Sequence, residues 1–211
     1  MALRRTVPLL VLCAVLAAVP AAHAGCGATV TAKAGKRLGD FTNPLIIGDS
    51  VLLGAVDAVA RTGWTVNAHG CRSWAEGARI VRRKAAAKKL PHMVAMFLGA
   101  DWQVSKSQIR ETLFRLGPSR VLVLVTPREV GGRGGTDAQN MRDVAKEHPD
   151  RVVLLDWVRH TRGRTSWFGP DGLHLGRPGI TGLARFLRFA LPFAEPGRFP
   201  GEPPPPAPST P

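Results

Sequence analysis

The sequence predicts an α/β domain built around a sheet of five parallel strands, and two patterns carry this prediction. Short apolar runs alternate along the chain with longer segments of helical periodicity, which is typical of repeated β-α units. The apolar runs show little alternation of apolar and polar residues, as expected for strands that helices cover on both faces. Such a sheet binds ligands beyond the carboxyl ends of its strands, so residues that follow the strands are the candidates for chemistry.

The chain begins with a segment typical of a secretory signal peptide, predicted over residues 1–24. Two arginines give it a basic start, an apolar run follows over residues 7–19, and the small residues Ala22 and Ala24 close it. The apolar run is shorter than the ~20 residues that span a bilayer. We therefore expect the mature protein to be secreted and to act outside the cell, in the cell envelope.

A polar leader is expected over residues 25–43, and a single domain follows over residues 44–194. The five predicted strands are residues 44–47, 64–67, 93–98, 120–126 and 151–156. The five predicted helices are residues 52–61, 74–87, 106–116, 137–147 and 179–190. Over residues 195–211 the chain is rich in proline and poor in large apolar side chains, which predicts a disordered or polyproline tail.

Two of the three cysteines lie beyond the predicted signal peptide. In an oxidising compartment, Cys26 and Cys71 are expected to form a disulfide, which would fasten the mature N-terminus to the turn after Gly70. The alternative is a lipidated Cys26, because residues 24–26 are similar to the end of a lipoprotein signal. His23 stands where such a signal has an aliphatic residue.

The chain is strongly basic, with a formal net charge of +14, which becomes +12 when a signal peptide with two arginines and no acidic residue is removed. In an exported protein without basic motifs interleaved with aromatic residues, this charge favours anionic cell-envelope polymers or lipid headgroups over nucleic acid. A solvated helix face is the alternative explanation for the basic cluster of Arg82, Arg83, Lys84, Lys88 and Lys89.

The first chemical motif, Gly48-Asp49-Ser50, directly follows the first predicted strand and opens a helix. A serine on this turn faces the space beyond the sheet, and its backbone N–H at the start of the helix is suited to stabilising an oxyanion. Asp and Ser are also ordinary helix-capping residues, so the motif alone does not decide between catalysis and capping.

The second motif is Asp171-Gly172-Leu173-His174, on the loop before the last predicted helix. A serine hydroxyl is a poor nucleophile at neutral pH. It needs an imidazole to accept its proton, and the imidazole needs an acceptor that fixes its tautomer. Asp171 and His174 can supply both groups, although an ordinary surface Asp and His would show the same spacing.

In order and context the two motifs resemble the first and last blocks of the SGNH/GDSL hydrolase family, over residues 44–190. The resemblance implies a flavodoxin-like three-layer α/β/α sandwich, the SGNH hydrolase fold. It also implies a catalytic triad in which Ser50 is the nucleophile, His174 is the base and Asp171 orients the histidine.

The resemblance extends to the oxyanion hole, with one departure. Gly70 matches the glycine whose backbone N–H enters the hole in the family's second block; a turn glycine that tolerates positive φ is the alternative explanation. The third block of the family reads Gly-x-Asn, whereas this chain has Gly99-Ala100-Asp101. An ionised Asp101 donates no hydrogen bond and would repel the oxyanion. Three explanations stay open: Asp101 is protonated and donates, it has another role, or it marks a weakened or inactive site.

The resemblance implies acyl transfer from an ester or acylated carbohydrate by a serine esterase or an O-acyltransferase. The extracellular domains of peptidoglycan O-acetyltransferases are similar in fold and share these blocks. Trp102 is the expected aromatic wall for an acyl or sugar group. We expect a monomer with reduced but real activity, no nucleic-acid partner, no cofactor, and no metal, because the histidines show no metal-ligand spacing.

Two other classes of function remain open. A catalytically silent module that binds cell-wall glycan is favoured by Asp101. An envelope structural protein would bind instead through its basic face and its proline-rich tail.

Overall fold

The computed structural model describes residues 26–129 and 134–201. The predicted signal peptide and the proline run at residues 203–206 therefore lie outside the described residues. In the described part of the chain, six strands form one sheet in the order β1-β3-β2-β4-β5-β6. They are β1 (Thr29–Ala32), β2 (Leu45–Gly48), β3 (Thr65–His69), β4 (Met93–Phe97), β5 (Val121–Val125) and β6 (Val152–Leu155). Neighbouring strands are parallel except β1 and β3, which are antiparallel.

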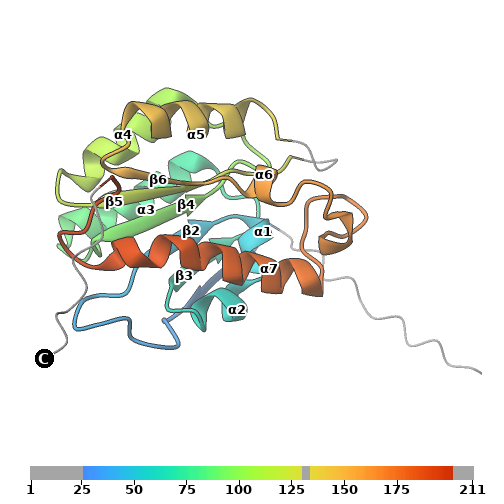
Figure 1. Ribbon diagram of the computed structural model, residues 1–211, viewed down its shortest axis with the longest axis horizontal. Coiled ribbons are helices and arrows are strands. Elements are labelled where there is room, and N and C mark those ends of the chain that lie inside the picture. The colour runs from blue at the N-terminus through green and yellow to red at the C-terminus, as the bar shows by residue number, and fades with distance from the viewer. Residues whose placement is uncertain (1–25, 130–133, 202–211) are drawn as a thin grey trace, which may run out of the picture.

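Helices cover both faces of the sheet, with α4 and α5 on one side and α7 on the other (Figure 1). The α-helices are α1 (Ser50–Leu53), α2 (Val56–Ala60), α3 (Trp74–Ala86), α4 (Lys106–Leu116), α5 (Thr136–Glu147), α6 (Trp157–His160) and α7 (Arg177–Leu187). Two 3₁₀ helices are η1 (Thr165–Trp167) and η2 (Arg188–Ala194). No helix in the described ranges combines the length and apolar character needed to cross a membrane.

Successive residues of the central strands face opposite helical layers, so the sheet separates two apolar cores. Ile46 and Ala95 belong to the core under α2 and α7. Their neighbours Ile47, Val94 and Met96 belong to the core under α3, α4 and α5. All five are fully buried, which explains why these strands read as continuous apolar runs. The three-layer α/β/α sandwich that the sequence predicts is confirmed.

The expected count of five strands is corrected to six, because the leader contributes β1. This strand pairs with β3 from Thr29 opposite His69 to Ala32 opposite Val66. Its residues are mostly exposed, so no apolar run marks the strand in the sequence. The predicted helix over residues 52–61 is also two helices, α1 and α2, separated after the cap at Gly54.

The start of the tail also needs correction. Phe199 packs against the core, and its ring meets the ring of His92 edge-on with a centroid distance of 5.3 Å. The carbonyl oxygen of Arg198 lies 3.1 Å from the His92 Nε2 atom. The chain therefore stays packed on the domain beyond residue 194, because one large apolar side chain within the tail reaches the core.

Candidate active site

The order of the sheet reverses at β2, which has β3 on one side and β4 on the other. In open α/β sheets such a switch point is where ligands bind. Ser50 begins α1 two residues after β2 ends, and Gly48 pairs with Phe97, the last residue of β4. The Gly48-Asp49-Ser50 and Gly99-Ala100-Asp101 motifs therefore lie at the same edge of the sheet.

Ser50, His174 and Asp171 are brought together by the fold, across 124 residues of sequence. The Ser50 Oγ atom lies 3.0 Å from His174 Nε2, and His174 Nδ1 lies 2.6 Å from Asp171 Oδ2. With its proton on Nδ1, the imidazole donates to Asp171 and accepts from the Ser50 hydroxyl. Ser50 is 4% exposed, whereas the other two side chains are partly exposed. A buried hydroxyl thus meets a base that solvent can reach.

Local hydrogen bonds shape the loop that carries Asp171 and His174. Asp171 Oδ1 accepts from the backbone N–H groups of Leu173 and His174, both at 3.0 Å, in the manner of an Asx turn. Gly172 has a φ of 68°, which glycine adopts without steric cost. Burial acts to raise the pKa of Asp171, but the hydrogen bonds from the His174 ring and the two N–H groups outweigh it, so the pKa lies below its usual value. Asp171 is therefore ionised at neutral pH.

Arg128 holds this loop from the end of β5. Its Nη1 donates to Thr161 Oγ1 at 2.9 Å, and its Nε donates to the Gly172 carbonyl at 3.2 Å. The guanidinium also lies 3.8 Å from the centroid of the Phe168 ring, within cation–π range. The sequence places Arg128 after a strand without indicating a role, and the structure makes it a support for the Asp-x-x-His loop.

Asp49 links the serine turn to the loop after β4. Its carboxylate, 1% exposed, accepts from Val51 N at 3.1 Å and from Ala100 N at 3.2 Å. The bond to Val51 confirms the capping role that the sequence suggests, whereas the bond to Ala100 spans 51 residues and has no sequence signal. Burial raises the pKa of Asp49 to about 7, against the lowering effect of these two bonds.

Arg72 fixes the ends of β2 and β3 relative to each other. This side chain is 5% exposed, and its Nη1 donates to the carbonyls of Gly48 at 3.0 Å and Asn67 at 2.7 Å. Gly48 lies two residues before Ser50, so Arg72 supports the turn that presents the serine. Sequence reasoning missed it; an arginine directly after a strand-end Gly-Cys pair is a weak signal in sequence.

The turn after β3 contains Gly70 and is cross-linked. Cys71 forms the predicted disulfide with Cys26, with a Cα–Cα distance of 5.1 Å, so Cys26 has no free thiol for lipidation. The residue with positive φ in this turn is Cys71, at 54°, and not the buried Gly70. The explanation of Gly70 as a turn glycine with positive φ is therefore wrong.

Trp102 is 57% exposed and donates its indole N–H to the Cys71 carbonyl at 2.9 Å. Asp101 is exposed, and within the described ranges no hydrogen bond or ion pair reaches its side chain.

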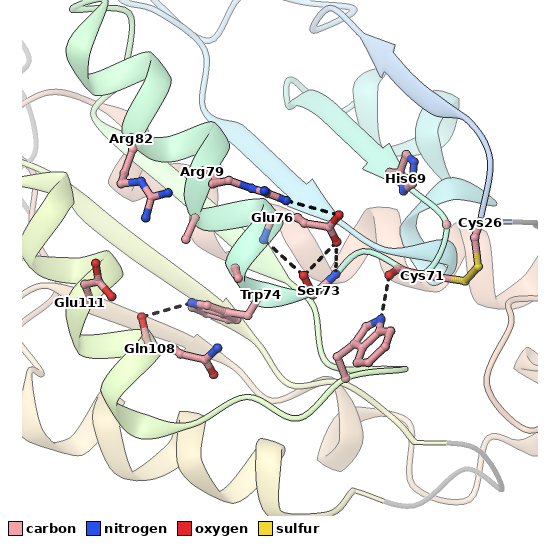
Figure 2. A pocket seen from close by; sticks show the side chains of 14 residues that line it. Cys26, His69, Cys71, Ser73, Trp74, Glu76, Arg79, Arg82, Gln108 and Glu111 are labelled. Atoms are coloured by element: carbon pink, nitrogen blue, oxygen red, sulfur yellow. Dashed lines mark hydrogen bonds and ion pairs between the residues drawn. A yellow bond between two sulfur atoms is a disulfide. The ribbon is translucent and has the colours of Figure 1, made fainter.

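A cavity of about 710 Å³ lies beside the triad, on the side of β3 and α3. Gly70, Cys71 and Trp102 line it, as Figure 2 shows for Cys71 together with Arg79 and Arg82 of α3. The cavity lining does not include the three triad residues. Trp102 thus lies at a cavity wall, and its contact with an acyl or sugar group stays a prediction.

Asp156, directly after β6, has structural partners. Asp156 accepts from both Arg142 Nε at 2.8 Å and Arg142 Nη2 at 3.0 Å, from Thr126 Oγ1 at 3.1 Å, and from the Arg159 N–H at the start of α6. These bonds saturate its carboxylate. In the part of the chain that the structure describes, no group of three or more His, Cys, Asp or Glu side chains is arranged to hold a metal ion.

The fold has relatives among solved structures. The C-terminal catalytic domain of Streptococcus pneumoniae peptidoglycan O-acetyltransferase A (OatA), solved with a methylsulfonyl adduct, superposes with a TM-score of 0.64 at 25% identity, covering 74% of this chain and 96% of that chain. A member of the lipolytic protein G-D-S-L family from Veillonella parvula superposes with a TM-score of 0.51 at 11% identity, over 71% of this chain and 97% of its own, and shows the shared fold alone.

The curated protein sequences that match this chain also include O-acetyltransferases. O-acetyltransferase OatA from Staphylococcus aureus is 28% identical over 152 residues, which cover 69% of this chain and 24% of that protein. The chain thus spans about a quarter of the length of the curated relatives it matches. None of the known protein-family models matches the chain.

Proposed function

We propose that this chain, an SGNH/GDSL-type serine hydrolase or O-acyltransferase, moves acetyl groups on and off cell-envelope carbohydrate with Ser50, His174 and Asp171 as its catalytic triad. The observation that carries the proposal is the continuous hydrogen-bonded series from the Ser50 hydroxyl through the His174 ring to the Asp171 carboxylate. The similarity to peptidoglycan O-acetyltransferases supports the acetyl group and the carbohydrate.

In the first half of the reaction, Ser50 Oγ attacks the ester carbonyl carbon while His174 Nε2 takes the hydroxyl proton. The backbone N–H groups of Ser50 and Gly70 stabilise the oxyanion of the tetrahedral intermediate. The intermediate collapses by breaking the bond to the leaving alcohol, which receives the proton from His174. The acyl group is then esterified to Ser50.

In the second half, an incoming hydroxyl loses its proton to His174 as its oxygen attacks the acyl-enzyme carbonyl. Ser50 leaves with that proton, and the enzyme returns to its starting state. When the hydroxyl belongs to water the product is a carboxylic acid, and when it belongs to a sugar the product is an acylated sugar. Throughout, the ionised Asp171 stabilises the imidazolium and fixes its orientation.

The proposed place of action is outside the cell, after removal of residues 1–24. The basic start, the apolar run and the small residues of this segment support export. The Cys26–Cys71 disulfide is what an oxidising compartment favours. Neither feature depends on the chemistry at Ser50, so export can be tested separately by locating the mature N-terminus.

A silent glycan-binding module is the second candidate, and Asp101 is the observation that favours it. If Asp101 is ionised at the oxyanion hole, its charge opposes the intermediate. Under this alternative, wild-type protein shows no detectable esterase activity, and Ser50→Ala binds cell-wall glycan as wild type does.

Turnover of an acetyl ester such as p-nitrophenyl acetate, measured with and without chitooligosaccharide acceptors, tests the proposed function. We expect acetate release or acetylated sugar from the mature protein, and a fall of roughly 10³-fold or more in kcat for Ser50→Ala and His174→Ala. Ser119→Ala, at an exposed serine before β5, is the matched control and should keep wild-type activity. Equal activity in Ser50→Ala and wild type would exclude the proposed nucleophile.

A further inference from the structure

A second hollow of about 480 Å³ continues from the cavity along α3, and its lining is dominated by cations. We call it the cationic pocket; the charged residues in its lining are Arg72, Glu76, Arg79, Arg82 and Arg83, and His69 also lines it. We propose that the cationic pocket binds an oxyanion, a carboxylate or a phosphate, carried by the glycan on which the triad acts. The identity of the glycan rests on the proposed function, whereas anion binding by the pocket does not.

The cationic pocket has more basic than acidic lining residues, and Glu76 and the buried Asp49 offset part of the charge of Arg72. Glu76 is its one acidic lining residue. Glu76 Oε2 accepts from Ser73 N at 2.8 Å, and Glu76 N donates to Ser73 Oγ at 3.4 Å, which together form the capping box of α3. Among the described residues, only Arg79 comes within ion-pair range of Glu76, at 3.5 Å. Within residues 26–129 and 134–201, no ion pair is found for Arg72, Arg82 or Arg83.

Arg72 gives the pocket a fixed, buried cation. The side chain is 5% exposed, and two carbonyls hold its Nη1 in place. A guanidinium held rigidly in this way is preorganised for an oxyanion, because its planar array of donors matches a carboxylate or a phosphate. One of these carbonyls belongs to Gly48, so the pocket and the Ser50 turn share a structural support.

The other arginines continue the pocket along one face of α3. Arg79 and Arg82 are three residues apart, and Arg79 and Arg83 are four apart, so their side chains lie on adjacent turns of the same face. Figure 2 shows Arg79 of α3 beside Glu76 and Arg82 further along the same helix. His69, Glu76, Arg79 and Arg82 also line the larger cavity, so the two hollows are continuous.

This continuity places the anion next to the proposed chemistry. The larger cavity begins at Gly70, whose N–H is proposed to hold the oxyanion, and the cationic pocket lies further along the same groove. A glycan with its acyl group at Ser50 would therefore extend an adjacent sugar toward the arginines. The acidic substituent of that sugar would select the glycan and set its direction in the groove.

Binding to the catalytically blocked variant Ser50→Ala tests the proposal without turnover. Three probes are titrated by calorimetry at low salt: neutral chitotetraose, tetragalacturonate as the carboxylate, and a short poly(glycerol phosphate) as the phosphate. We expect one or both acidic probes to bind about tenfold more tightly than the neutral one, and Arg82→Ala/Arg83→Ala to remove most of this difference. The acidic probe that binds more tightly identifies the recognised group.

Lys84→Ala/Lys89→Ala is the matched control, because it removes the same charge from the end of α3 and the turn that follows it, outside the lining of both hollows. We expect its affinities to stay within about twofold of Ser50→Ala. Equal affinity for all three probes, or an equal loss in both double variants, would overturn the proposal and leave α3 as a solvated basic face. Acidic-probe binding by a protein whose wild type shows neither acetate release nor acetyl transfer to sugar would instead refute the proposed function and leave the anion site standing.

Discussion

Ser50 depends on side chains that meet it only in three dimensions. In the proposed mechanism His174 supplies the base and Asp171 holds the imidazole, while Asp49 links the serine turn to Ala100 on the loop after β4. The Asp171–His174 unit is local and is built by backbone hydrogen bonds within four residues. Disturbing the unit should therefore impair chemistry with little effect on the fold.

Replacing Asp101 by Asn should raise the turnover of acetyl esters. The asparagine amide can donate a hydrogen bond to the oxyanion, whereas an ionised carboxylate cannot. Full donors of this kind contribute about 10²–10³ in rate, and the exposure of Asp101 makes a gain of about tenfold the reasonable expectation. Steady-state kcat on p-nitrophenyl acetate is the measurement, with Ser50→Ala/Asp101→Asn as the inactive control. Unchanged or lower kcat would place Asp101 outside the oxyanion hole.

Asp49 should make stability fall as the pH rises. Burial raises its pKa from 3.8 to about 7 in the folded protein, so folding favours the protonated carboxyl. Its stabilising contribution is complete below pH 3.8 and is lost as the pH rises through 7. Because one pKa unit corresponds to about 1.36 kcal/mol, the loss amounts to at most about 4 kcal/mol.

Urea unfolding of wild type and Asp49→Asn between pH 4 and pH 8 isolates this effect. As the pH rises, wild type should lose unfolding free energy relative to Asp49→Asn. The variant lacks the titrating carboxyl, while every other titrating group is shared. A difference that does not change with pH would show that Asp49 titrates normally.

Among the larger elements, the turn after β3 carries most of the arrangement beside the serine. It bears Gly70, its Cys71 carbonyl holds Trp102, and its disulfide fastens the segment that enters β1. The bridge closes a loop of 45 residues that contains β1, β2 and β3. Removing it frees both the edge strand and one side of the cavity.

Replacing Cys26 and Cys71 by serine should lower the free energy of unfolding by about 2–5 kcal/mol, mainly because the unfolded chain gains conformational entropy. Chemical denaturation with and without reductant measures the loss. Reductant should bring wild type down to the level of the double variant and leave the double variant unchanged. Wild type that keeps its stability in reductant would mean that the bridge contributes nothing to folding.

For the molecule as a whole, the sequence predicted the layers of the fold and the meeting of Ser50, His174 and Asp171. Buried parallel strands leave continuous apolar runs, and the Ser50 and Asp-x-x-His motifs occupy fixed places relative to them. β1 was missed because an exposed edge strand has no apolar pattern. Phe199 was missed because a single apolar residue in a proline-rich segment gives no periodic signal.

Arg72, Asp49 and Arg128 support the site, and their roles could not be predicted from the sequence, for a different reason. Arg72 reaches Gly48 across 24 residues, Asp49 reaches Ala100 across 51, and Arg128 reaches Gly172 across 44. Each bond depends on which strands become neighbours. Strand order cannot be predicted from the local propensities or the spacing of residues. Long-range polar contacts of this kind emerge only once the sheet order β3-β2-β4 is known.

Covalent labelling of the mature protein with a fluorophosphonate, followed by peptide mass spectrometry, examines the proposed nucleophile itself. Because His174 activates Ser50, the label should appear on Ser50 in wild type and form roughly 10³-fold more slowly in His174→Ala. Ser50→Ala should take up no label. A folded protein that leaves Ser50 unlabelled, or that is labelled at another serine at the same rate in His174→Ala, would contradict the catalytic role of this triad.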